Sequence, residues 1–216
     1  MNDTLTIALS KGILLEPALA LLKRVGLAPK AIASDSRKLI VEHQVGRVTL
    51  MMIRPSDVPT YVEYGAVDAG IVGADVLMEQ ATDVYEPLDL KFGGCRLAVA
   101  APESAVTRNG RHGTRLRVAT KYPNLTERYF TQQGIPIEII KLYGSVELAP
   151  LVGLADRIVD LVASGATLRA HHLVMTDVIM ESTARLIVNR ASLTVKHQRV
   201  RGVIDALRMA VQGGRA

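Results

Sequence analysis

The chain has 216 residues, a formal net charge of +5, a hydrophobic content of 49% and an aromatic content of only 4%. This length can bury a sizeable core, as one large domain or two small lobes, and that core must be aliphatic. The few aromatics argue against a stacking platform for nucleic acid, and the scattered basic residues are expected either to be a solvated surface or to attract polyanionic small molecules.

The N-terminus and the single cysteine bear on where the protein works. Residues 1–4 lack the basic start and apolar core of a signal peptide, and no apolar run reaches the length of a membrane span. Cys95 can form no disulfide within the chain and is expected to pack as a small hydrophobe. We therefore expect a cytoplasmic protein with no membrane partner.

The first part of the chain alternates strand-like and helix-like segments. Apolar residues at helical spacing predict helices, and short β-branched runs between turn residues predict strands. Ser56 is expected to cap the second helix. The predicted strands cover residues 5–9, 38–42, 48–53 and 69–72, and the predicted helices cover 14–25, 56–64 and 74–79.

The polar residues of this part gather at strand ends. Lys11 follows the first strand, Arg54 follows another, and residues 68–75 place glycines around a third. A lysine point charge and an arginine fork suit a pyrophosphate, although each alone could be an ordinary surface charge. Their shared position favours an anion site.

A second block begins near residues 93–94 and again alternates strands and helices. The last helix, over 193–211, is amphipathic. The predicted strands cover residues 96–101, 116–120, 136–140, 158–162, 174–180 and 185–188, and the other predicted helices cover 125–133 and 146–152. The pattern indicates an α/β protein with mostly parallel sheets in two lobes, with ligands bound beyond the carboxyl ends of strands.

Residues 158–169 read as a strand carrying Asp160, a Ser-Gly-Ala-Thr turn and the first turn of a helix. Unpaired N–H groups at a helix start favour an anion, and Gly165 lets the backbone approach it. Ser164 and Thr167 can donate hydroxyl hydrogen bonds to a phosphate, while Asp160 can hold sugar hydroxyls or a magnesium ion. The alternative is an ordinary turn with Thr167 as the helix N-cap. No Gly-Lys-Ser/Thr follows, so this is not a Walker loop.

Taken together, these segments resemble the short-form catalytic chain of the ATP phosphoribosyltransferase family over nearly the whole length. Residues 147–168 carry the most specific part: an acidic residue, a Gly-x-Ala-Asp step, a strand with Asp160 and then Ser-Gly-x-Thr-Leu. One departure is Ile13, where the family usually has arginine. The longest of the other matching segments is IRPSDVPTYVEYGAVDAGIVGADVL at 53–77. The rest are LTIALSKG at 5–12, SRKL at 36–39, YEPLDL at 85–90, CRLAVA at 95–100 and ESTARLIVN at 181–189.

The resemblance implies a two-lobed fold of the type II periplasmic-binding-protein kind, with a cleft between lobes. Lobe I would comprise residues 1–91 plus 178–216, and lobe II residues 92–177. It also implies the first step of histidine biosynthesis, in which ATP and 5-phosphoribosyl 1-pyrophosphate give N1-(5-phosphoribosyl)-ATP and pyrophosphate. The resemblance further implies a requirement for magnesium, which is expected to be held mainly by substrate. Separately, the five histidines show no metal-ligand spacing.

The chemistry of the residues agrees with this reaction. Residues 164–167, including Gly165 and Ala166, would hold the 5-phosphate, and Asp160 with Glu147 would hold the ribose hydroxyls. Lys11, Arg54 and magnesium would neutralise the departing pyrophosphate, so Arg54, Lys11 and Asp160 are the expected catalytic residues. The remaining expected substrate contacts are Asp68, Gly73, Arg96, Lys121 and Tyr122, the last three towards ATP.

The expected partners also follow from the resemblance. We expect this chain to be without the C-terminal regulatory domain that long-form members carry. Short-form members work with a histidyl-tRNA-synthetase-like subunit, so we expect a homodimer of catalytic chains in a hetero-oligomer, an octamer being one such assembly. Histidine would then inhibit only through the partner.

Two rival functions stay open from the residues alone. One is a non-catalytic solute sensor of the same fold, against which the lack of an export signal and of a DNA-binding segment counts. The other is a purine-type phosphoribosyltransferase. Those enzymes usually carry two adjacent acidic residues before the phosphate loop, whereas Val159 precedes Asp160 here.

Overall fold

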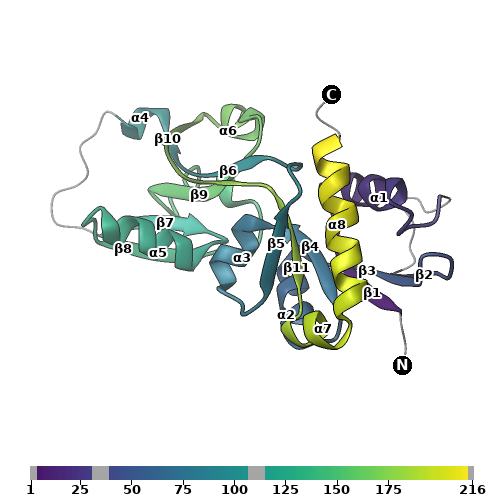
Figure 1. Ribbon diagram of the computed structural model, residues 1–216. Helices are drawn as coiled ribbons and strands as arrows, with labels where there is room; N and C mark the ends of the chain where they lie inside the picture. Colours follow the sequence, from purple (N-terminus) through teal and green to yellow (C-terminus); the bar gives the residue numbers. More distant parts are fainter. Residues whose placement is uncertain (1–3, 31–38, 107–114, 214–216) are drawn as a thin grey trace. The chain divides into compact units, whose positions relative to one another are not determined.

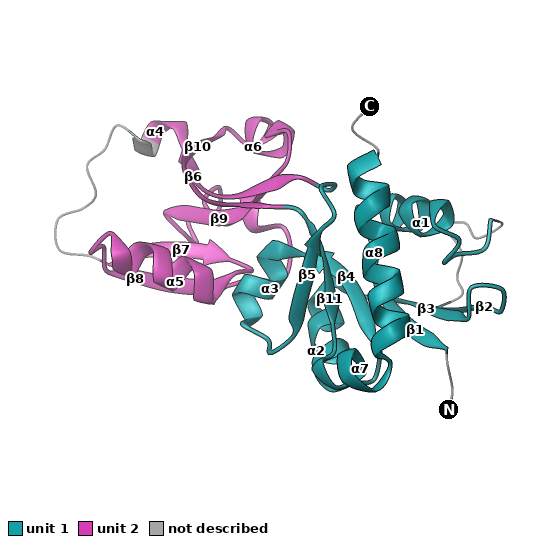
Figure 2. Cartoon of the chain, in the orientation of Figure 1, with its two compact units in different colours: residues 1–93, 183–216 teal, residues 94–182 magenta. Residues whose placement is uncertain are grey.

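A computed structural model describes residues 4–30, 39–106 and 115–213, and the chain forms two compact units (Figure 2). Unit 1 comprises residues 1–93 and 183–216, and unit 2 comprises residues 94–182. The expected lobe boundaries were 91/92 and 177/178, whereas the strand predicted over 174–180 continues to Ser182 within unit 2. No helix among the described residues combines the length and the hydropathy needed to cross a membrane.

Unit 1 is built on a six-stranded sheet of order β2-β3-β1-β4-β11-β5 (Figure 1). The central strands β3, β1 and β4 are parallel, with Leu5 opposite Val48 and Ile7 opposite Ala69. Their carboxyl ends therefore meet at one edge of the sheet. The strands are β1 (Leu5–Ser10), β2 (Ile40–His43), β3 (Val48–Ile53), β4 (Ala69–Gly73), β5 (Tyr85–Asp89) and β11 (Ala184–Val188).

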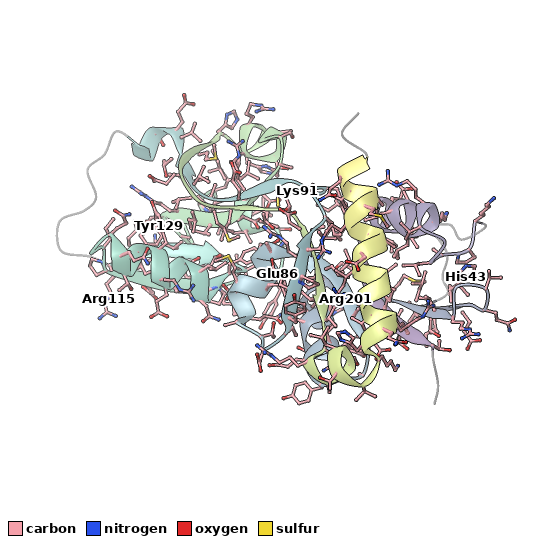
Figure 3. The ribbon with its side chains drawn as sticks, viewed as in Figure 1. His43, Glu86, Lys91, Arg115, Tyr129 and Arg201 are labelled. Carbon is pink, nitrogen blue, oxygen red and sulfur yellow. The ribbon has the colours of Figure 1, made fainter. Side chains whose placement is uncertain are left out.

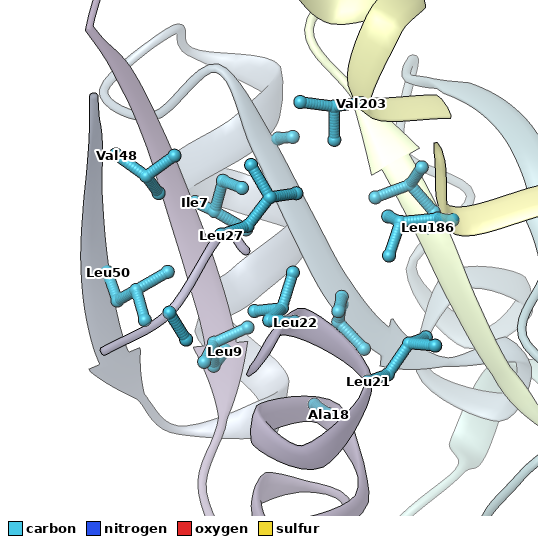
Figure 4. Packing of buried hydrophobic residues seen from close by; sticks show 14 of the residues in the cluster. Ile7, Leu9, Ala18, Leu21, Leu22, Leu27, Val48, Leu50, Leu186 and Val203 are labelled. Atoms are coloured by element: carbon cyan, nitrogen blue, oxygen red, sulfur yellow. The ribbon is translucent and has the colours of Figure 1, made fainter. Parts of the chain in front are cut away.

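Helices cover both faces of this sheet. The larger apolar cluster joins α1 and α8 to one face, where alternate residues of β1 such as Ile7 and Leu9 are fully buried (Figure 4). A second cluster joins α2 and α3 to the other face through Ala8, Val72 and Ile187. The helical elements are α1 (Leu15–Arg24), η1 (Pro55–Asp57), α2 (Val58–Glu63), α3 (Ala74–Gln80), α7 (Arg190–Val195) and α8 (His197–Gly213).

Two predicted helices differ in detail. Ser56 caps no helix: it lies inside the short η1 turn and donates its hydroxyl to Asp57 Oδ1 at 2.8 Å. The helix predicted over 193–211 is two helices, because Asn189 starts α7 early by accepting from the Ser192 N–H, and the chain turns at Lys196. Lys38, the first residue of one predicted strand, lies outside the described residues.

Unit 2 is built on a five-stranded sheet of order β10-β6-β9-β7-β8. Its apolar clusters place α5 on one face and the segment of η2 with α6 on the other. The elements are β6 (Cys95–Pro102), β7 (Leu116–Thr120), β8 (Ile137–Lys141), β9 (Arg157–Val162), β10 (Leu173–Ser182), α4 (Glu103–Val106), α5 (Pro123–Gln132), η2 (Val146–Leu148) and α6 (Ala166–Ala170).

Both sheets are mixed rather than mostly parallel. Of the nine strand pairings among the described residues, β1·β3, β1·β4, β7·β8 and β7·β9 are parallel and the other five are antiparallel. A four-residue turn joins β2 to β3, which allows only an antiparallel hairpin. Strand β5, which the sequence did not predict, adds one more antiparallel pairing through β11.

The two chain segments that connect the units are tied together at Asp89. Its carboxylate accepts hydrogen bonds from Lys91, both backbone and side chain, and from the Thr183 hydroxyl (Figure 3 labels Lys91). Partial burial alone would raise the pKa of Asp89, but these hydrogen bonds and Arg185 outweigh it and lower the pKa to about 2. The carboxylate therefore stays ionised well below neutral pH.

Candidate functional site

A pocket of about 340 Å³ in unit 2 brings together seven of the residues expected to bind substrate. These are Lys121, Glu147, Asp160, Ser164, Gly165, Ala166 and Thr167. A larger hollow of about 490 Å³ lies in unit 1 against the β2–β3 hairpin, but none of the expected residues lines it. The chemistry of the lining residues, rather than size, identifies the unit 2 pocket as the candidate site.

Strand β9 explains why Asp160 enters this pocket. Side chains alternate along a strand, so Asp160 shares a face with Ile158 and Val162, and that face is the one packed against η2 and α6. Glu147 lies in η2, and Lys121 follows the β7 residue that pairs with Val159. Three charged side chains from separate segments thus meet at the end of β9.

The environment of Asp160 is unusual for a carboxylate. Burial raises its pKa above the ordinary value, and nearby Glu147 adds to the effect, while the Leu161 N–H and Lys121 oppose it. The Leu161 N–H donates to Asp160 Oδ1 at 2.9 Å. The hydrogen bond from Leu161 holds the carboxylate in one orientation, but it does not replace all the hydrogen bonds that burial removes. Hydroxyl groups of a bound ligand could supply the missing hydrogen bonds.

The turn after β9 has the backbone geometry that a phosphate loop needs. Gly165 has φ +73°, a left-handed conformation that glycine adopts readily, and it stands as the N-cap of α6. The Ala166 N–H donates to Ser164 Oγ at 3.3 Å. Thr167 is not the N-cap but the second residue of α6, and with only five residues this helix contributes little dipole. Anion binding here would rest on N–H and hydroxyl groups.

Two residues of this region were not singled out from the sequence. Ser145 lines the pocket from a left-handed position, φ +46°, at the start of η2. Arg169 donates from Nη1 to the Ser164 carbonyl oxygen at 3.2 Å, so its guanidinium folds back onto the loop.

In unit 1, Lys11, Arg54 and Gly73 do lie at one edge of the sheet. Ser10 pairs with Ile53, so Lys11 and Arg54 leave adjacent parallel strands at the same level. The Lys11 N–H donates to the Ile53 carbonyl oxygen at 2.9 Å, which fixes the two backbones together. Both side chains are exposed. Gly73 ends β4, and a Cβ there would lie 2.2 Å from Asp75 Oδ1, so a larger residue would disturb this edge.

Asp68 does not fit the substrate-binding role that was expected. Asp68 is only 7% exposed, and both of its carboxylate oxygens accept hydrogen bonds from groups of unit 1. Oδ2 accepts from Lys196 Nζ at 2.8 Å and from the Thr6 N–H at 2.9 Å, and Oδ1 accepts from the Ser192 hydroxyl at 2.7 Å. Asp68 therefore fastens the α7–α8 junction to β1.

The remaining expected contacts are not among the residues that line the pocket. Tyr122 packs against the apolar cluster under α5, on the opposite face of the sheet from Asp160, so its expected contact with ATP has no support in the geometry. Arg96, on β6, is not among the lining residues, although it pairs with Val162 of β9, which does line the pocket. Ile13 is 74% exposed and brings no charge to unit 1.

Comparison with known proteins gives one consistent result. The family model described as HisG, ATP phosphoribosyltransferase, matches residues 54–209. "ATP phosphoribosyltransferase 2" of Geobacter sulfurreducens is 54% identical over 208 residues, covering 96% of this chain and 98% of the relative. The ATP phosphoribosyltransferase of Syntrophomonas wolfei is 49% identical over 215 residues, covering 100% and 99%.

Solved structures extend the comparison to the fold. A chain of the "ATP phosphoribosyl transferase (HisG:HisZ) complex from Thermotoga maritima" superposes with a TM-score of 0.83 at 34% identity, covering 97% of this chain and all of that chain. The alkanesulfonate-binding protein SsuA from Xanthomonas axonopodis has a TM-score of 0.58 at 16% identity, covering 96% of this chain and 73% of that chain. The second likeness, at 16% identity, concerns the fold alone.

Proposed function

The chain belongs to the ATP phosphoribosyltransferase family, and from this premise we propose which of its residues hold each substrate. Its reaction is the first step of histidine biosynthesis: transfer of the 5-phosphoribosyl group from 5-phosphoribosyl 1-pyrophosphate to N1 of ATP, with release of pyrophosphate. The observation that carries the assignment is the unit 2 pocket, where two carboxylates, a lysine and a hydroxyl-rich glycine turn converge.

The pocket residues divide between the sugar and its phosphate. The 5-phosphate would accept hydrogen bonds from Ser164, Thr167 and the N–H groups of the turn. The ribose hydroxyls would donate to Asp160 and Glu147, since an ionised carboxylate can only accept. The desolvated Asp160 gains most from such donors, because they supply the compensation that the free protein lacks. Lys121 is placed to reach either a phosphate or the ATP.

We propose that magnesium enters this pocket together with the substrate. Among the described residues, no group of three or more His, Cys, Asp or Glu side chains is placed to hold a metal ion. Magnesium commonly binds through one or two carboxylates together with substrate phosphates, and Asp160 with Glu147 provides that number. The ion would neutralise charge on the pyrophosphate.

Charge neutralisation on the leaving group is the proposed task of Lys11 and Arg54. Breaking the bond to pyrophosphate leaves an oxocarbenium-like sugar, and catalysis is therefore mostly positioning and electrostatics. Adenine N1 is unprotonated at neutral pH, so no strong general base is needed. Both side chains are exposed at the edge of the unit 1 sheet and free to meet an anion there.

Pyrophosphate release measured with ATP, and separately with free nucleobases, tests the function itself. Release that requires both ATP and the sugar pyrophosphate supports the assignment. Release with a free nucleobase instead would support a purine-type enzyme, and binding without any turnover would support a sensor. Both substrates are cytoplasmic metabolites, which is the setting we propose for the enzyme.

Replacing Thr167 with alanine is expected to weaken binding of 5-phosphoribosyl 1-pyrophosphate by about 1–3 kcal/mol, the usual loss for a hydrogen bond to a charged group. Titration calorimetry measures this directly, and ATP binding should change much less. Thr131→Ala, on the exposed surface of α5, is the matched control. Unchanged binding of the sugar pyrophosphate by the Thr167 variant would remove this residue from the site.

Replacing Arg54 with lysine is expected to lower kcat by about tenfold or more, because a point charge cannot make the two parallel hydrogen bonds of a guanidinium fork to pyrophosphate. Steady-state kinetics with both substrates saturating checks the effect. Arg47→Lys, on the β2–β3 turn, is the control. Normal turnover by the Arg54 variant would leave Arg54 as a surface charge only.

We also propose that the catalytic chain self-associates and assembles with a histidyl-tRNA-synthetase-like regulatory subunit. The support is the likeness to the Thermotoga maritima chain, whose structure is a HisG:HisZ complex. Gel filtration of the mixed proteins should show co-elution, and histidine should inhibit the complex but not the isolated chain. Separate elution, or strong inhibition of the chain alone, would contradict this assembly.

A further inference from the structure

The peptide bond between Ser164 and Gly165 is held from one side by an arginine. Arg169 Nη1 donates to the Ser164 carbonyl oxygen at 3.2 Å, and the Arg169 N–H donates to the Gly165 carbonyl oxygen at 3.1 Å. The guanidinium also lies over Gly165, where an added Cβ would meet Nη1 at 3.2 Å. Arg169 thus touches both residues of this peptide.

This contact fixes the direction of an N–H group. In a trans peptide the carbonyl and the following N–H point in opposite directions. Ser164 and Gly165 line the unit 2 pocket, whereas Arg169 does not. Holding the Ser164 carbonyl on the side of Arg169 therefore turns the Gly165 N–H the other way. Within the described residues this N–H has no hydrogen-bond acceptor.

The loop has the freedom to adopt the opposite orientation. A peptide flip changes ψ of the residue before it and φ of the residue after it, and glycine tolerates both signs of φ. Gly165 has φ +73° in the present orientation. In the flipped orientation the Ser164 carbonyl would replace the N–H on the pocket side and would repel a phosphate. Phosphate binding therefore requires an interaction that favours the present orientation of the Ser164–Gly165 peptide over the flipped one.

We propose that Arg169 is a positioning residue that latches the Ser164–Gly165 peptide with its N–H towards the 5-phosphate of 5-phosphoribosyl 1-pyrophosphate. This inference rests on the proposed phosphate-binding role of residues 164–167. Arg169 acts through the peptide and not as a charge on the phosphate, because its guanidinium lies outside the pocket lining. Its removal allows the flipped loop to compete, and the affinity for the phosphate falls in proportion to the fraction of chains that keeps the Gly165 N–H towards the pocket.

Arg169→Met tests the latch, since methionine keeps an unbranched side chain but cannot donate. Calorimetry should show 5-phosphoribosyl 1-pyrophosphate binding about tenfold weaker, as for the loss of one stabilising hydrogen bond, with ATP binding unchanged. The difference should persist in high salt, because a positioning effect is not screened. Arg128→Met, which removes an exposed charge from α5, is the matched control and should bind normally.

A second measurement observes the peptide itself. On addition of ribose 5-phosphate, the Gly165 amide proton should move downfield in the wild-type chain and much less in Arg169→Met. Normal binding by the variant, or a difference that disappears in high salt, would overturn the latch. Failure of the wild-type chain to bind the sugar pyrophosphate would instead overturn the phosphate-loop assignment, so the two failures are distinguishable.

Discussion

Replacing Asp160 with asparagine is expected to weaken binding of 5-phosphoribosyl 1-pyrophosphate while making the free protein more stable. Each hydrogen bond from a ribose hydroxyl to the carboxylate contributes about 1.5–3 kcal/mol, so the loss of one weakens binding roughly 10- to 150-fold. Stability should rise because the desolvated carboxylate costs folding free energy that a neutral amide does not. Such opposite effects would be hard to explain by a purely structural role.

The pH dependence of this stability gain has a definite sign. Burial raises the pKa of Asp160 in the folded protein above its value in the unfolded chain, so folding loses stability as pH rises through the folded pKa. Asparagine cannot ionise and avoids that loss. The gain in melting temperature should therefore be full at neutral pH and should shrink as pH falls to the ordinary aspartate value of 3.8.

The control for Asp160 is Glu127→Gln, which removes one exposed carboxylate from α5 in the same unit. It should change neither binding nor the melting temperature by a measurable amount. Thermal unfolding from pH 4 to 7 and calorimetry with the sugar pyrophosphate give both readouts. An Asp160 variant that is less stable and binds normally would make Asp160 a structural residue.

Replacing Asp68 with alanine is expected to destabilise the protein by about 3 kcal/mol while leaving substrate affinity intact. Removing one member of a buried ion pair typically costs 3–5 kcal/mol, and the lower end applies because the Lys196 side chain is 28% exposed. The Thr6 N–H and the Ser192 hydroxyl lose their acceptor as well. Urea unfolding should show a lower midpoint.

Asp205→Ala provides the matched control on α8. Asp205 pairs with Arg208 at 2.6 Å, but both side chains are more than 40% exposed, so its loss should cost at most about 1 kcal/mol. Equal stability of the two variants would show that the Asp68 contacts contribute little. A stable Asp68 variant with poor substrate binding would restore the role that the sequence suggested.

The part of the site that could be predicted from the sequence is the part that is local in the sequence. Glu147, Asp160 and residues 164–167 belong to one signature segment, and strand alternation with a following turn is enough to bring them to one pocket. Likewise, Lys11 and Arg54 follow strands whose parallel pairing could be expected. The α/β class and the two-lobed organisation follow from the same alternation of segments.

What could not be predicted depends on contacts between distant residues. Asp68 looks like a free carboxylate beside a strand, and only Lys196, 128 positions away, shows that it is engaged. That same contact accompanies the break between α7 and α8, which the apolar periodicity does not reveal. Tyr122 sits beside Lys121 in the sequence, yet its ring packs on the other face of the sheet.

The position of β11 in the unit 1 sheet sets the order in which the nascent chain can fold. β11 lies between β4 and β5 and hydrogen-bonds to both. These two earlier strands therefore cannot join one sheet until residue 188 has left the ribosome. Unit 2 is continuous and ends at residue 182, and its sheet can therefore close first. Translation from β5 to β11 takes roughly 5–20 s, during which the inner edge of β4 is an open template for wrong pairing.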